Sequence, residues 1–91
     1  MANITYESLD VDDEVVQLSS AKFDTSPPKV SALITVEDVS VRYRIDGGSP
    51  TATEGHLVTT NDVIQLESYQ EIQQFKVIST ATGSVIKVTC W

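Results

Sequence analysis

The chain has one cysteine, Cys90, and one histidine, His56, among its 91 residues. A single cysteine excludes an internal disulfide. Because Cys90 lies in an alternating apolar segment, we expect a buried thiol, as suits a protein made in a reducing cytosol. One cysteine and one histidine also fall short of the three or four ligands that a zinc site needs.

Long apolar runs are missing as well. No stretch approaches the roughly 18 residues of a membrane helix. The N-terminal segment MANITYESLD is polar and acidic, without the basic and apolar regions of a secretory signal. We therefore expect one small domain that neither spans nor binds a membrane.

Catalytic motifs are also absent from the sequence. The serines form no GxSxG elbow, and Gly47-Gly48 is not followed by GK[ST]. His56 has no recognisable partner nucleophile or base. The acidic cluster Asp10–Glu14 lacks the glycine and the distal glutamate of a calcium loop. We expect no enzymatic activity, no cofactor and no metal.

Basic residues are scarce: six Lys and Arg face 13 Asp and Glu, which gives a net charge of −7. Nine of the acids lie in residues 1–46, where four basic residues oppose them. Such a surface repels phosphates, so we expect no nucleic-acid partner. The acidity can serve solubility alone or docking onto a basic protein surface, and the sequence leaves both open.

What the chain does contain is alternation. After Pro28, β-branched residues alternate with polar ones, as in half-buried strands. Turns are expected at 46–48, 61–62 and 82–84. Short strands separated by turns predict an all-β fold, a small antiparallel sandwich or jelly-roll-like barrel, over residues 29–91. The expected strands cover 29–36, 41–45, 63–67, 72–79 and 85–91, with Val30, Ala32, Ile34, Val36, Val41, Tyr43, Ile45, Ile64, Leu66, Phe75, Val77, Ile86, Val88 and Cys90 facing inward.

Residues 1–28 have a different character. They hold the acidic cluster Asp10–Glu14 and end in the stiff pair Pro27-Pro28. Segments 14–18 and 21–23 are candidates for one or two strands. Two alternatives remain open: these strands are ordinary members of the same sheets, or the segment is an arm that docks on a neighbouring subunit.

Five segments after residue 40 form a further pattern: VRYRIDGG (41–48), PTATEGHL (50–57), NDVIQLES (61–68), EIQQFKVIST (71–80) and SVIKVTCW (84–91). This pattern resembles a family of small bacteriophage virion structural proteins, of the capsid decoration (cement) or head–tail accessory type. The resemblance covers a little over half of the chain and leaves out residues 1–40. It implies a component of a phage particle without saying which one, and it carries no binding residue over to this chain.

The function that we expect follows from the resemblance together with the small size, β-rich pattern and acidity. It is a capsid decoration protein that bridges and stabilises major capsid subunits on the phage head, after synthesis in the host bacterial cytoplasm. The alternatives are a head–tail or tail accessory protein, and a carbohydrate-binding surface module that uses Trp91, Tyr69 and Tyr6. A small core gains stability from oligomerisation, and a closed homotrimer is the first expectation.

Nine residues are candidates for contact with a partner. The acids of the N-terminal cluster suit a basic capsid surface. The two arginines lie on the face opposite Tyr43, and the large aromatic at the chain end suits an interface. The full set is Asp10, Asp12, Asp13, Glu14, Arg42, Arg44, Glu54, His56 and Trp91.

Overall fold

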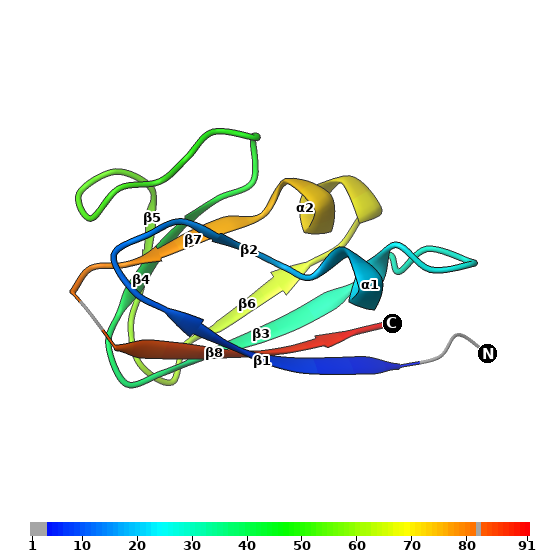
Figure 1. Ribbon diagram of the computed structural model, residues 1–91, viewed down its shortest axis with the longest axis horizontal. Helices are drawn as coiled ribbons and strands as arrows, with labels where there is room; N and C mark the ends of the chain where they lie inside the picture. Colours follow the sequence, from blue (N-terminus) through cyan, green and yellow to red (C-terminus); the bar gives the residue numbers. More distant parts are fainter. Residues whose placement is uncertain (1–3, 82) are drawn as a thin grey trace.

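The computed structural model describes residues 4–81 and 83–91, which form eight strands and two short helices (Figure 1). Within these residues, no helix has the length and apolar character that crossing a bilayer requires. In chain order the elements are β1 (Thr5–Val11), β2 (Val16–Gln17), α1 (Ser20–Phe23), β3 (Ala32–Glu37), β4 (Val41–Arg44), β5 (His56–Val58), β6 (Val63–Leu66), α2 (Tyr69–Gln74), β7 (Lys76–Ser79) and β8 (Ser84–Cys90).

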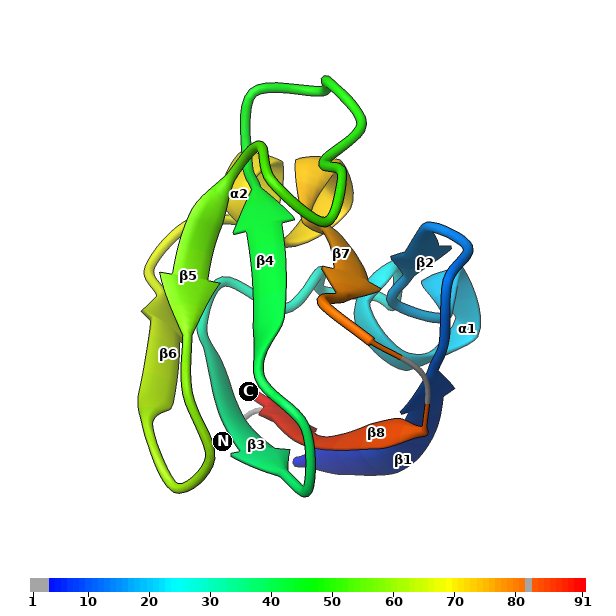
Figure 2. The same cartoon turned by 90° about the vertical axis from the view of Figure 1, so that its left-hand side faces the viewer.

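The strands form two antiparallel sheets, sheet A with the order β1-β8-β3-β6 and sheet B with the order β2-β7-β4-β5. The first strand pairs with the eighth, the second with the seventh, the third with the sixth and the fourth with the fifth. This nested pairing is the strand order of a jelly roll. Figure 2 shows the two sheets wrapping around a shared interior. The all-β prediction is confirmed, and the strand order supplies the topology that the alternation left open.

The core lies between the sheets and follows the alternation of the strands. In β8, Ile86, Val88 and Cys90 are buried, whereas the residues between them are half-buried on the outer face. Burial also raises the pKa of the Cys90 thiol, as expected for an inert cysteine. The buried apolar residues are Val11, Leu18, Phe23, Ala32, Ile34, Val36, Val41, Val58, Ile64, Leu66, Ile72, Phe75, Val77, Ile86, Val88 and Cys90.

One of the side chains predicted to face inward lies elsewhere. Val30 is 55% exposed, because β3 begins only at Ala32. The backbone N–H groups of Val30 and Ser31 both donate to the carbonyl of Trp91, so this segment runs beside the end of β8 instead of extending the alternation. Tyr43 packs against the core as predicted, with its ring stacked on buried Phe75, although it is only partly buried.

The predicted strand over residues 72–79 is wrong in its first part, which belongs to α2. The Ser68 hydroxyl accepts a hydrogen bond from the Glu71 N–H (3.1 Å), and Glu71 Oε1 accepts one from the Glu67 N–H (2.9 Å). This capping arrangement satisfies N–H groups that a helix start leaves unpaired. Ile72 is consequently buried from a helix, and the strand begins only at Lys76.

The N-terminal segment contributes to both sheets. β1 pairs with β8 over its whole length, and β2 pairs with β7. Polar side chains on the inner side of β1 hold α1 in place: the Thr5 hydroxyl donates to the Lys22 carbonyl (2.7 Å), and the Glu7 carboxylate accepts from the Ser19 N–H (3.1 Å) and hydroxyl (2.7 Å). Residues 21–23, a candidate strand, are part of α1 instead. Of the two alternatives, membership of the sheets matches this pairing.

The two ends of the sandwich differ in their connections. Links of three or four residues join β1 to β2, β3 to β4, β5 to β6 and β7 to β8, and they gather at the left of Figure 1. The long connections that contain α1 and α2 lie at the right, where β8 finishes. The turn predicted at 61–62 is present, with φ of 74° at Asn61. Of the turn predicted at 82–84, Thr82 lies outside the described residues, Gly83 has φ of 84°, and Ser84 opens β8.

Candidate functional site

Four of the nine candidate residues meet at the long connection between β4 and β5, residues 45–55. Arg44, Glu54 and His56, together with Gly55, line a pocket of about 490 Å³, which we call the loop pocket. Arg42 lies two residues before Arg44 on the same strand and supports the loop. The structure thus brings together residues that the sequence suggested separately.

Arg42 fastens the loop to its strand. Its Nε donates to the Ala52 carbonyl (3.0 Å), and a terminal nitrogen donates to the Gly55 carbonyl (2.9 Å). Gly55 has φ of +125°, and a Cβ there would lie 3.1 Å from the Tyr43 carbonyl oxygen. The loop therefore needs glycine at this point. The role of Arg42 is to position the loop.

Arg44 is held by a neighbouring carboxylate. Its Nε donates to Asp46 Oδ1 (3.0 Å), and the two residues form an ion pair. Asp46 Oδ1 also accepts from the Gly48 N–H (3.0 Å), closing the turn predicted at 46–48. The hydrogen bond from Arg44, and then that from Gly48, lower the pKa of Asp46 to about 2. In turn, the hydrogen bond to Asp46 raises the pKa of Arg44.

His56 is exposed and lies against an aromatic stack. Its ring centroid is 5.4 Å from that of Tyr43, whose ring in turn stacks at 5.5 Å on buried Phe75. None of the residues that line the loop pocket is a serine, cysteine or lysine. Among the described residues, no group of three or more His, Cys, Asp or Glu side chains is placed to hold a metal ion. The loop pocket presents a mixed-charge recess suited to binding a polar group.

The predicted acidic cluster lies at the end that carries the short connections. Asp10, Asp12, Asp13 and Glu14 are all exposed there. Asp12 also has a structural role: its Oδ1 accepts from the Gly83 N–H (2.9 Å), and its carbonyl accepts from the Ser79 N–H (2.9 Å). The cluster is thereby fixed against the connection between β7 and β8.

Further acids lie on the other short connections at the same end of the sandwich. Glu37 and Asp38 come from the end of β3, and Asp62 comes from the link between β5 and β6. The Thr60 hydroxyl donates to the Asp38 carbonyl, which ties these two links together. We call this surface the acidic end: Asp10, Asp12, Asp13, Glu14, Glu37, Asp38 and Asp62, seven of the 13 acids in the chain. Residues 10–15, 37–40, 59–62 and 80–83 contain no Lys or Arg.

Trp91 lies at the opposite end, on the outer side of sheet A. It is 37% exposed, and its backbone exchanges two hydrogen bonds of 3.0 Å with Ser31. Tyr6 and Leu33, which are 56% and 38% exposed, both lie opposite Thr89 on the strands that flank β8. Ile4 is 69% exposed at the start of β1. We call these side chains, Ile4, Tyr6, Leu33 and Trp91, the apolar patch.

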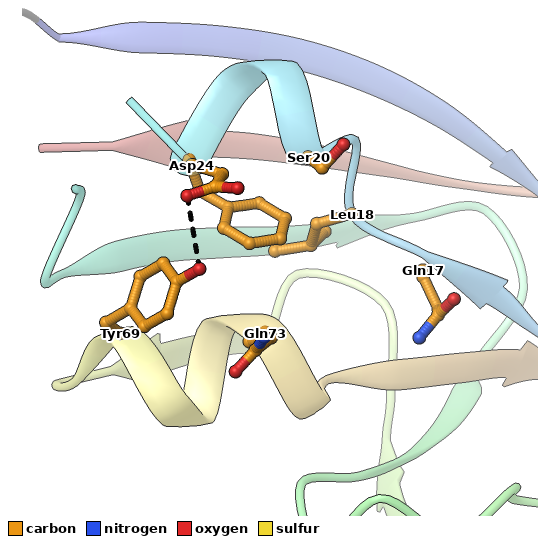
Figure 3. A pocket seen from close by; sticks show the side chains of 7 residues that line it. Gln17, Leu18, Ser20, Asp24, Tyr69 and Gln73 are labelled. Carbon is orange, nitrogen blue, oxygen red and sulfur yellow. Dashed lines mark hydrogen bonds between the residues drawn. The ribbon is translucent and has the colours of Figure 1, made fainter. Parts of the chain in front are cut away.

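A second pocket was not foreseen from the sequence. It lies between α1 and α2, has a volume of about 300 Å³, and is shown in Figure 3; we call it the helix pocket. Tyr69 donates to Asp24 Oδ1 across its mouth (3.2 Å). Burial, and then the Asp24 carboxylate, raise the pKa of Tyr69, so the phenol stays protonated as a donor. Its lining residues are Gln17, Leu18, Ser20, Phe23, Asp24, Tyr69 and Gln73.

Comparisons of the chain with protein-family models, with curated proteins and with solved structures found no match.

Proposed function

We propose that this protein is a non-enzymatic structural component of a phage particle, a capsid decoration protein that bridges and stabilises major capsid subunits on the head surface. The resemblance of residues 41–91 to phage virion proteins supports a place in a phage particle. The observation that carries the docking mechanism is the acidic end, where seven exposed acids from three separate parts of the chain lie at one end of the sandwich and the short links there contain no Lys or Arg.

The acidic end suits a basic partner surface. Its carboxylates lie on short links and on the strand ends beside them, and hydrogen bonds tie these segments together, so little conformational freedom is lost on docking. Exposed charge pairs are individually weak and mainly guide association. A decoration protein nevertheless contacts the shell at many equivalent positions, and one subunit that touches two capsid subunits gains from the high local concentration of the second site.

The apolar patch supports self-association. Four exposed apolar side chains gather on the outer face of sheet A, and Trp91 is among them, as expected for an interface aromatic. The patch lies at the far end of a molecule whose longest dimension is 38 Å, so contact there keeps the acidic ends of neighbouring copies apart. We propose a closed homotrimer formed through this patch, with every acidic end free to face the shell.

A head–tail or tail accessory role is the second candidate. The loop pocket favours this role, because it is a mixed-charge recess on a fixed loop and so offers a second contact surface besides the acidic end. Contacts between two different surfaces of neighbouring copies build rings. Copy number separates the two roles: hundreds of copies per particle indicate the head, and about a dozen or fewer indicate the neck or tail.

The test uses particles that lack this protein, to which purified protein is added back. We expect Asp13→Asn/Glu14→Gln to reduce occupancy and to slow association more than it speeds release, and occupancy of the wild type to fall as salt rises. Both side chains are exposed and neither makes a hydrogen bond within the described residues, so the fold is retained.

The matched control is Glu67→Gln/Glu71→Gln, which makes the same change in net charge away from both the acidic end and the loop pocket, and a glutamine at position 71 can still accept the capping hydrogen bond. It is expected to bind like the wild type. Equal loss in both variants would show that overall charge, not the acidic end, controls attachment. Full occupancy by both, at every salt concentration, would move docking to another surface, with the loop pocket next.

A further inference from the structure

The helix pocket is formed by two connections that are far apart in sequence. α1 lies in the link between β2 and β3, and α2 lies in the link between β6 and β7. The two helices contact each other directly, and the rings of Phe23 and Tyr69 are 6.0 Å apart at an angle of 58°. Figure 3 shows side chains from α1, α2 and the end of β2 converging on one recess of about 300 Å³.

The floor of this recess is apolar. Phe23 and Leu18 are each 5% exposed and belong to the main core, so they are held by packing on their far sides. Tyr69 is partly buried and packs against the same cluster. A floor that the core holds rigidly is preformed, and an apolar surface of this kind favours the C–H face of a small ligand.

The rim is polar and offers groups of both kinds, donors and acceptors. The side-chain amides of Gln17 and Gln73 are exposed and make no hydrogen bond among the described residues. Each amide supplies two donor hydrogens and one acceptor oxygen. Tyr69 uses only Oδ1 of Asp24, which leaves Oδ2 as a further acceptor, and the Ser20 hydroxyl completes the rim.

The charge of the lining narrows the ligand class. No Lys or Arg lines the recess, so nothing there neutralises a phosphate or carboxylate ligand. A cationic ligand would meet a single carboxylate, Asp24, one oxygen of which already accepts from Tyr69, whereas the other six lining side chains are neutral. A neutral ligand remains, one whose polar groups each donate and accept and whose body has an apolar face.

A sugar ring has both properties, since every hydroxyl is a donor and an acceptor and the ring presents C–H faces. We propose that the helix pocket binds one neutral pyranose unit, with its C–H face toward Tyr69 above the floor of Phe23 and Leu18, and with its hydroxyls on Gln17, Gln73 and Asp24. This activity is separate from docking at the acidic end, because the two surfaces lie at opposite ends of the sandwich.

The proposal is tested by following backbone amide resonances of the intact protein during titration with methyl α-glucoside, methyl α-mannoside, methyl β-galactoside and N-acetylglucosamine. We expect one of these sugars to give saturable shifts confined to residues 17–24 and 69–73. The dissociation constant should be about 1–10 mM, because a small recess offers few contacts. No saturable shift with any of the four would overturn the proposal.

Variants then separate specific binding from surface contact. Gln17→Ala and Gln73→Ala should each weaken binding about fivefold, the loss of roughly one hydrogen bond. Gln70→Ala, on the same helix but outside the pocket, should leave the affinity unchanged. Unchanged affinity in Gln17→Ala/Gln73→Ala would refute the site. Displacement of the sugar by methylguanidinium would also refute it, in favour of a basic side chain from a protein partner.

Discussion

The acidic end and the helical end of this jelly roll are built on the same eight strands but differ in the length of their connections. Links of three or four residues at the acidic end contribute no buried side chain among the described residues, and several of the exposed side chains that they carry are acids. The long links at the other end contain α1 and α2, whose residues Phe23 and Ile72 are buried. The helix pocket lies between these two helices. Connection length therefore decides where this fold can bind a small ligand and where it can only present charge.

The largest difference between the ends should appear in stability. Phe23→Ala removes a ring that is 5% exposed between α1 and the core, and should lower the free energy of unfolding by about 3–5 kcal/mol. Urea denaturation measures this value. Val63→Ala, which truncates an apolar side chain that is 58% exposed and lies outside the apolar patch, is the control and should change stability by about 0.5 kcal/mol or less. A loss below about 1 kcal/mol for Phe23→Ala would mean that the helical end has no core of its own.

The second expected effect concerns the cap of α2. Ser68→Ala leaves the Glu71 N–H without its acceptor and should cost about 1 kcal/mol. Ser49→Ala, in the exposed part of the loop between β4 and β5, should be neutral. Equal values for the two variants would show that the capping hydrogen bond adds nothing to the stability of the helical end.

Within the acidic end, stability should depend on one acid more than on its neighbour. Asp12→Ala removes the acceptor for the Gly83 N–H and should cost about 1 kcal/mol. Asp13→Ala, at an exposed side chain without a hydrogen bond in the described residues, should stay within about 0.5 kcal/mol. If Asp13→Ala proved the more destabilising, the acidic end would not be organised around Asp12.

The smallest expected effect lies in the loop between β4 and β5, a long connection without a helix. The pKa of Asp46 is lowered to about 2, below the usual value of about 3.9. Its stabilising contribution is therefore complete above about pH 4 and disappears as the pH falls through about 2. Carboxyl carbon chemical shifts should titrate at Asp46 with a midpoint near 2, and Arg44→Gln should raise that midpoint. A midpoint near 4 in the wild type would show that the ion pair does not persist in solution.

Much of the fold could be predicted from the alternation of apolar and polar residues along the chain. Alternation in β8 predicted burial of Ile86, Val88 and Cys90, because the core face of a central strand is apolar throughout. β1 gave a weaker signal, since only Leu9 and Val11 are apolar on its inner side. Its first inward residues, Thr5 and Glu7, instead bond to α1. Such contacts depend on a helix whose position the sequence does not reveal.

The helix α2 had a signal that the alternation concealed. Phe75 and Val77 alternate as in a strand, and extending that alternation back to Ile72 produced the wrong prediction. The pattern Ser68-x-x-Glu71 just ahead is a capping box and would have marked the helix start. Local capping chemistry was therefore more informative here than the period of the apolar residues.

The candidate sites also differ in how far the sequence predicts them. The acids of the N-terminal cluster are neighbours in sequence, so their grouping was predictable, whereas Glu37, Asp38 and Asp62 joined them only through the strand topology. The helix pocket had no sequence signal, because Phe23 and Tyr69 meet only once β2-β3 and β6-β7 connections fold back over the same end. Long-range placement of this kind is a property of the jelly-roll pairing.

The most direct test of the account is an image of the phage particle at a resolution that orients this domain. The account predicts hundreds of copies on the head, with the short links and their acids against the shell and with α1, α2 and the helix pocket facing solvent. Density that places the helical end against the shell, or that finds about a dozen copies at the neck or tail, would contradict it.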